Sequence, residues 1–157
     1  MTAPVSPDAP HAPMPVTDLR AFFEGSWRIV REIDDRRAGA RHEMHGTGTF
    51  APAPGEPDAL VYDEEVVWAP AGQTLTATRR YLIAGIRGAA AEVLFDDGRP
   101  FHALDLAAGT CPVHHGCPPD SYAGDYRVLD WNRFTVRWAV TGPRKDSVLF
   151  TTFTRVG

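Results

Sequence analysis

Hydrophobic and polar residues alternate along most of the chain after residue 26, in short stretches separated by turn-forming residues. In the first stretch the alternation places Trp27, Ile29 and Arg31 on one face, because successive side chains of a strand point to opposite sides. The Asp-Gly pair at 97–98 is favourable in a tight hairpin turn, and other turn signals separate the remaining stretches. The pattern predicts about nine antiparallel strands, and therefore a β-barrel or a β-sandwich.

The segment before the first strand divides into an arm and a helix. Residues 1–16 contain five prolines, which fix φ and remove backbone donors, so we expect an extended, disordered arm. Thr17 is a suitable N-cap for a short helix that ends near Gly25. One face of this helix carries Leu19, Phe22 and Phe23. We therefore predict two parts, a Pro/Ala-rich disordered arm at 1–16 and a β-barrel domain at 17–157.

Composition and charge narrow the classes of function. The chain has 157 residues, of which 43% are hydrophobic, enough for one domain with a substantial core. The net charge of −4 argues against general affinity for nucleic acids or anionic membranes, and no apolar run approaches the roughly 18 residues of a membrane span. The N-terminus lacks the basic start and apolar segment of a signal peptide, so we expect a cytoplasmic protein. Its two cysteines do not form the disulfide framework of a secreted domain.

Both ends of the predicted sheet carry residues typical of one superfamily. Gly25, Ser26 and Trp27 open the first strand after the short helix, and Arg155 lies near the end of the last strand. In this arrangement the chain resembles the calycins, which include lipocalins and fatty-acid-binding proteins. The resemblance implies that Arg155 stacks on Trp27 at a closed barrel end, a cation–π contact of roughly 0.5–2 kcal/mol.

Further motifs are similar to those of a family of small, uncharacterised bacterial proteins with calycin-like barrels. In chain order they are GSWR, YDEE, RRY, FDDGRPFH, HGCPPDSY and GPRKD, within a span from about residue 19 to 156. The resemblance implies an all-β fold, a single antiparallel calycin-like β-barrel of about nine strands with a short N-terminal helix. It implies no established activity. The sequence requires no cofactor, and Arg28, Ile29 and Val30 stand where nitrobindin-type haem barrels carry glycines.

Charged and phenolic side chains fall on strand faces that we expect to point into the barrel. In LVYDEEVVW, alternation places Tyr62 and Glu64 among apolar residues, and in LTATRRYLI it does the same for Arg79 and Tyr81. Burying Glu64 or Arg79 alone is unfavourable, so we expect them to pair with each other or with a ligand. The residues predicted to bind a ligand are Tyr62, Glu64, Arg79, Tyr81, His102, His115, Tyr122, Tyr126 and Trp138.

Two other arrangements of these residues stay open. The interior side chains could satisfy one another and leave no space for a ligand. Alternatively, a register shifted by one residue would place Glu64 and Arg79 as a cross-strand pair on the solvated face.

The stretch 111–117, CPVHHGC, is predicted to be a loop between two strands. Thiolates and imidazoles together are the ligands that zinc and copper prefer. The candidate metal ligands are Cys111, His114, His115 and Cys117. Their spacing is not that of a zinc finger or zinc ribbon, and the alternative is a loop with surface histidines and free thiols.

A catalytic interpretation uses the same region of the sequence. His102 and His115 are candidate general bases near neutral pH, and Cys117 is a candidate nucleophile. Their candidate partners are Asp120, Tyr122 and Lys145.

Our leading hypothesis is therefore a cytoplasmic barrel that binds a small, partly apolar molecule, with neither nucleic acid nor membrane as partner. A homodimer is left open. The alternative is an enzyme, namely an isomerase, cyclase or hydrolase using His102, His115 and Cys117, with zinc as candidate metal. A third hypothesis is a protein-interaction module with a packed interior. The sequence identifies neither the ligand nor a cofactor.

Overall fold

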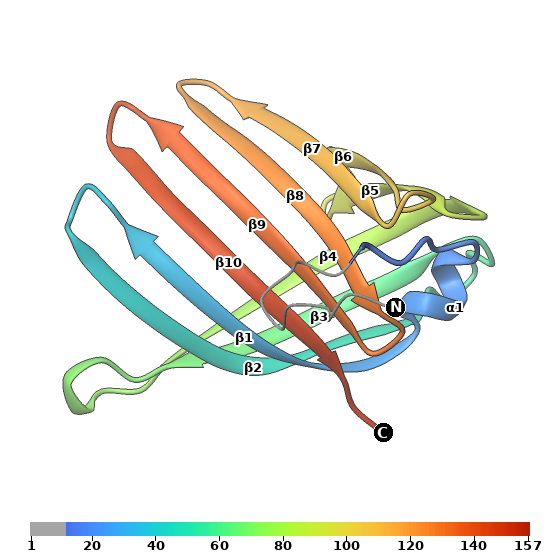
Figure 1. Cartoon of the computed structure of the whole chain (residues 1–157), viewed down its shortest axis with the longest axis horizontal. Helices are drawn as coiled ribbons and strands as arrows, with labels where there is room; N and C mark the ends of the chain where they lie inside the picture. Colours follow the sequence, from blue (N-terminus) through green and yellow to red (C-terminus); the bar gives the residue numbers. More distant parts are fainter. Residues whose placement is uncertain (1–11) are drawn as a thin grey trace, which may run out of the picture.

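The computed structural model of the protein describes residues 12–157, which form one antiparallel sheet curled into a barrel (Figure 1). Its helices are α1 (Leu19–Phe23) and the short 3-10 helix η1 (Pro70–Gly72). Its strands are β1 (Gly25–Asp35), β2 (Ala40–Pro52), β3 (Leu60–Trp68), β4 (Leu75–Arg87), β5 (Ala90–Phe95), β6 (Pro100–Asp105), β7 (Thr110–Cys117), β8 (Asp120–Asp130), β9 (Arg133–Gly142) and β10 (Lys145–Arg155). Around the sheet they follow the order β6-β5-β4-β3-β2-β1-β10-β9-β8-β7.

This fold confirms the predicted all-β barrel, with ten strands in the described residues instead of about nine. The additional strand is β7, so the prediction of a loop at 111–117 is wrong. Exposure alternates along β7 as expected for a strand, with Val113 buried, His114 exposed and His115 half-buried. The sequence does not reveal this alternation, because polar residues lie on both faces of the strand. Pro112 is tolerated because β7 lies at an edge of the sheet and pairs only with β8.

Apolar residues of α1 close one end of the barrel. The helix is capped by Asp18 and not by the predicted Thr17, because Asp18 Oδ1 accepts a hydrogen bond from the backbone nitrogen of Ala21 at 3.1 Å. The buried side chains of α1 are Leu19, Phe22 and Phe23. Trp27 is fully buried beside them, and its indole Nε1 donates to the carbonyl oxygen of Phe23 at 2.9 Å.

Arg155 completes this closed end. Its guanidinium carbon lies 4.2 Å from the centroid of the Trp27 ring and 4.9 Å from that of Trp131. Arg155 also donates to the carbonyl oxygens of Phe22 at 2.7 Å and Trp131 at 2.8 Å. Since Trp27 and Arg155 are register partners on β1 and β10, the contact confirms the predicted stacking.

The chain packs against the closed end before the helix begins. Val16 is buried, and its backbone nitrogen donates to the carbonyl oxygen of Leu106 at 3.0 Å. Val16 therefore belongs to the packed structure, although the predicted disordered arm included it. The rest of that arm up to residue 11 lies outside the described residues. Among the described helices, none has the length and apolar character needed to cross a bilayer.

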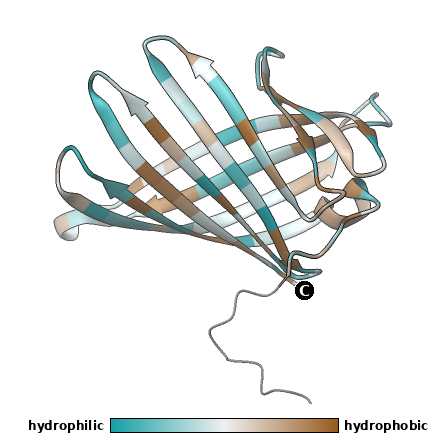
Figure 2. Cartoon of the chain, turned by 45° about the horizontal axis from the view of Figure 1, so that its top comes forward, coloured by the Kyte–Doolittle hydropathy of each residue, from teal (hydrophilic) through white to brown (hydrophobic). Residues whose placement is uncertain are grey.

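The opposite end of the barrel is open. The turns of the β1–β2, β9–β10 and β7–β8 hairpins lie there, at the upper left of Figure 1, and residues 75–80 of β4 are all exposed. Hydrophobic and hydrophilic residues alternate along the strands, as expected when one face of each strand points inward (Figure 2). The described sheet ends at β6 and β7, which share no backbone ladder, so the barrel is nearly closed. We call this line between β6 and β7 the seam.

Candidate functional site

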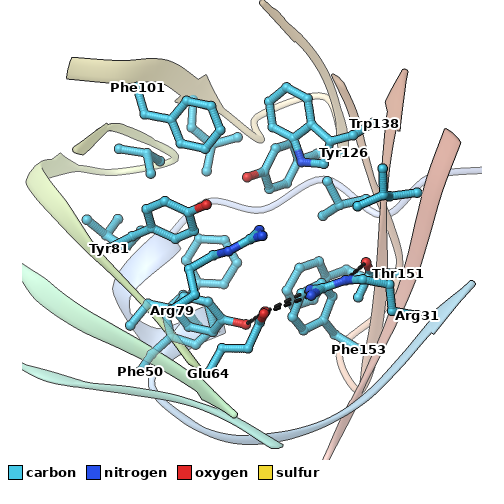
Figure 3. Close-up of a pocket in the computed structure, with 18 residues that line it drawn as sticks. Arg31, Phe50, Glu64, Arg79, Tyr81, Phe101, Tyr126, Trp138, Thr151 and Phe153 are labelled. Atoms are coloured by element: carbon cyan, nitrogen blue, oxygen red, sulfur yellow. Dashed lines mark hydrogen bonds and ion pairs between the residues drawn. The ribbon is translucent and has the colours of Figure 1, made fainter. Parts of the chain in front are cut away.

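Two adjacent spaces lie inside the barrel and at its open end. The inner cavity is walled mainly by aromatic and aliphatic side chains and includes three charged residues, Arg31, Glu64 and Arg79 (Figure 3). The volume that the centres of water molecules can occupy in this cavity is about 70 Å³. We call the wider space at the open end the mouth; its volume by the same measure is about 570 Å³. Residues that line both are Arg79, Tyr81, Phe101, Trp138 and Leu149. The two spaces are therefore adjacent and share part of their lining.

A buried ion pair lies in the inner cavity. Arg31 Nη1 and Nη2 donate to the two carboxylate oxygens of Glu64, each at 2.8 Å, and the side chains are only 8% and 3% exposed. The Tyr62 hydroxyl donates to Glu64 Oε1 at 2.7 Å, and Arg31 Nε donates to Thr151 Oγ1 at 2.8 Å. These bonds satisfy both charged groups without a ligand.

This pairing sets the charge states of the cluster. Burial alone would raise the pKa of Glu64, but the hydrogen bonds and charge of Arg31 outweigh it and lower that pKa. Burial followed by the nearby Glu64 charge raises the pKa of Tyr62 well above its ordinary value. At neutral pH the cluster is therefore an arginine–glutamate ion pair with a neutral phenol.

The prediction that Glu64 pairs with Arg79 or with a ligand is wrong about the partner. The two residues are register partners on β3 and β4, but Glu64 binds Arg31 on β1 instead. Gly48 is the register partner of Glu64 on β2, the strand that separates β1 from β3. A Cβ at Gly48 would lie 2.8 Å from the Tyr62 ring, so this glycine leaves the space in which the cluster assembles.

Arg79 extends its guanidinium toward the middle of the inner cavity, as Figure 3 shows. Its guanidinium carbon lies 5.8 Å from the centroid of the Tyr81 ring. Burial raises the pKa of Tyr81, and the Arg79 charge opposes this rise without cancelling it, so the phenol is neutral at pH 7. Within residues 12–157, no carboxylate lies at ion-pair distance from Arg79.

Aromatic rings form the wall opposite Arg79. The rings of Phe101 and Trp138 are stacked, with centroids 5.2 Å apart and an interplanar angle of 12°. Phe95 stacks on Phe101 at 4.6 Å, which extends the wall into the mouth. Trp138 fits because its register partner on β8 is Gly124, where a Cβ would lie 2.8 Å from the indole ring.

His102 does not line either space, although we predicted it to contact a ligand. It is buried, and its Nδ1 lies 2.9 Å from the carbonyl oxygen of Ala103, which can only accept, so Nδ1 carries the proton. Nε2 therefore accepts from the Tyr126 hydroxyl at 3.2 Å. Burial lowers the pKa of His102, which favours this neutral form. His102 thus fixes the orientation of Tyr126, which does line the inner cavity.

The mouth brings together other residues of the predicted site. His115, Cys117 and Tyr122 line it, and His115 Nδ1 donates across the seam to the carbonyl oxygen of Phe101 at 3.0 Å. At the rim, Lys145 forms an ion pair with Asp120 at 2.9 Å and reaches the Tyr122 hydroxyl at 3.4 Å; both of these lie on β8. The bond to Asp120 raises the pKa of Lys145.

The four candidate metal ligands are not gathered at one point. His114 faces away from the barrel interior and its Nε2 bonds Ser121 Oγ at 3.0 Å, whereas His115 and Cys117 face the mouth. In the described part of the chain, no group of three or more histidine, cysteine or acidic side chains is placed to hold a metal ion. The catalytic set is also divided, because His102 is buried behind the wall and Asp120 is paired with Lys145. A catalytic role for these residues stays a prediction.

Sequence reasoning missed three residues that shape the site. Arg31 had a usable signal, since it shares a predicted strand face with the apolar Trp27 and Ile29. Thr151 and Phe101 had none, because a threonine or a phenylalanine in an alternating strand is equally compatible with a packed core.

Solved structures with this fold share little sequence with the chain. An S-type phycobiliprotein lyase from Guillardia theta is 12% identical, with a TM-score of 0.62 over 89% of this chain and 93% of that chain. A DUF3598-family protein of unknown function from Nostoc punctiforme is 13% identical, with a TM-score of 0.62 over 96% of this chain and 53% of that chain. EF1p2_mFAP2b, bound to DFHBI, is 10% identical, with a TM-score of 0.51 over 88% and 98%. These likenesses show the fold.

Comparison by sequence gives one family. The family of unknown function DUF6314 matches residues 23–155, which include every strand that lines the site. No curated protein matches the chain.

Proposed function

The chain belongs to DUF6314, a family of unknown function, and we propose that it is a barrel that binds a small, partly apolar molecule. One observation carries the proposal: next to the inner cavity lies a mouth of about 570 Å³, and the two share a wall with the aromatic rings of Tyr81, Phe101 and Trp138. Sites for small molecules are typically concave, mostly apolar and about 300–1,000 Å³ in volume, with a few polar groups that fix orientation.

The sizes of the two spaces indicate how a ligand would lie. The inner cavity alone has room for a few water molecules, because one water needs about 10–15 Å³ by this measure. A ring system therefore lies in the mouth, against Phe101 and Trp138, and one end of the ligand reaches past Tyr81 into the inner cavity. A protein of similar fold is bound to DFHBI, and another is a phycobiliprotein lyase, which supports a ligand-binding use of this barrel.

A neutral aromatic probe tests this function. We expect N-phenyl-1-naphthylamine to bind with an increase in its fluorescence, and Trp138→Ala to weaken binding by roughly 3- to 10-fold through the lost ring contact. The measurement is a fluorescence titration of the purified protein, with folding verified by circular dichroism.

The matched control is Trp131→Ala, which removes an exposed indole at the closed end. Its binding should equal that of the wild type. If the probe fails to bind the wild type, or if both variants weaken binding equally, the proposal is wrong.

A further inference from the structure

The charges inside the barrel do not cancel. Of the residues that line the inner cavity, Arg31 and Arg79 are positive and Glu64 is negative, so the lining carries a net charge of +1. The Arg31–Glu64 pair is neutral as a unit and is enclosed by Tyr62 and Thr151. The remaining charge belongs to Arg79.

Glu64 cannot serve a positively charged ligand. Both of its oxygens accept hydrogen bonds from Arg31, and Oε1 accepts a third from Tyr62. A ligand amine would have to displace a donor from a pair that is almost completely buried, which leaves Arg31 uncompensated.

Arg79 differs from the arginine next to it. Arg80 also lines the mouth, but its guanidinium is already paired, because its Nε lies 2.6 Å from Asp63 Oδ1 in an exposed ion pair. Arg79 faces the inner cavity and the mouth, and its planar guanidinium offers donors in the geometry that binds the two oxygens of a carboxylate. Arg80, which lines the mouth but not the inner cavity and already has a carboxylate partner, is therefore a control for Arg79.

The surroundings of Arg79 restrict the rest of the ligand. Besides Arg79, the residues that line both spaces are Leu149 and three aromatic residues, Tyr81, Phe101 and Trp138, whose rings offer flat apolar surface. Arg80, Asp96 and Asp97 also line the mouth, but Arg80 is paired with Asp63, so a second negative charge on the ligand would face the two aspartates without a free cation.

From these observations we infer that the ligand is a flat aromatic monocarboxylate, whose carboxylate is bound by Arg79 while its ring packs against Tyr81, Phe101 and Trp138. The inference rests on the proposed function and adds the charge and shape of the ligand. Arg79 is the residue that selects for the acid.

Three probes with the same ring test the charge. They are 2-naphthoate, 2-naphthamide and 2-naphthyl phosphate, measured by isothermal titration calorimetry at pH 7.5. The wild type should bind 2-naphthoate roughly 10- to 100-fold more tightly than 2-naphthamide, the ratio expected for charge-assisted hydrogen bonds. The phosphate should bind more weakly than the carboxylate.

Variants assign the effect to one side chain. Arg79→Gln should reduce the naphthoate-to-naphthamide ratio to about one, because a neutral side chain forms no charge-assisted hydrogen bonds with the carboxylate. Arg79→Lys should retain part of the ratio, since it keeps the charge and loses the planar fork. Arg80→Gln should retain the full ratio.

The outcomes separate this inference from the proposed function. Equal binding of 2-naphthoate and 2-naphthamide by the wild type overturns the inference and leaves a neutral-ligand barrel. Tighter binding of 2-naphthyl phosphate, or loss of the ratio in Arg80→Gln, overturns the assignment of a monocarboxylate to Arg79. Failure of all three probes and of N-phenyl-1-naphthylamine overturns both.

Discussion

The two ends of this barrel use the same kind of contact, an arginine beside aromatic rings, for different purposes. At the closed end, Arg155 lies between Trp27 and Trp131 and donates to backbone carbonyl oxygens. At the open end, Arg79 lies beside Tyr81 and has no carboxylate partner within residues 12–157. The comparison teaches that the number of satisfied donors, and not the residue type, distinguishes a structural arginine from one available to a ligand.

The largest expected difference between the two ends is in the free energy of unfolding after a tryptophan is removed. Trp27→Ala should lower the free energy of unfolding by about 3–5 kcal/mol, because the fully buried indole leaves a cavity among the α1 rings. Trp138→Ala should cost only about 1–2 kcal/mol, because the indole is half-buried. Urea denaturation measures both, and equal losses would contradict the division into a structural and a ligand-facing end.

Removing one charge of the buried Arg31–Glu64 ion pair should have a smaller effect on the free energy of unfolding. Glu64→Gln should destabilise the protein by roughly 3 kcal/mol, because Arg31 then remains charged and buried without a compensating anion. The double variant Arg31→Met/Glu64→Leu should recover most of that loss, since neither charge has to be desolvated. If the single and double variants have equal free energies of unfolding in urea, the loss in Glu64→Gln does not come from an uncompensated charge on Arg31.

The smallest effect is a dependence on pH through His102. Because burial lowers its pKa in the folded protein below the ordinary 6.5, the unfolded chain binds a proton first as the pH falls. The free energy of unfolding should therefore decrease as the pH is lowered below about 6.5, until the folded-state pKa is reached. In His102→Gln this part of the slope should vanish. An unchanged slope in urea titrations at several pH values would show that other groups cause it.

Much of the site was predictable because strand alternation is a local property. The inward positions of Glu64, Arg79 and Tyr81 follow from a period of two, and the structure places all three in the lining of the inner cavity. Alternation also indicates that Trp138 faces inward, and it does. The closed end was accessible through the Gly-x-Trp and arginine at the two ends of the chain.

The pairing of charges was not predictable in the same way. Arg31 and Glu64 lie on strands separated by β2, so their contact depends on the curvature of the sheet and on a missing side chain at Gly48. Neither can be read from spacing. The strand β7 was missed for another reason: an edge strand tolerates Pro112 and polar residues that would interrupt a central strand.

The seam is where the circumference of the barrel is held most weakly. Separating any two paired strands would break a whole row of backbone hydrogen bonds, but β6 and β7 are bridged by side chains, such as His115 to Phe101 and, from β8, Tyr126 to His102. Each such bond contributes about 0.5–1.5 kcal/mol net. Changing the circumference therefore costs least along the seam, where fewer hydrogen bonds have to break than between any two paired strands.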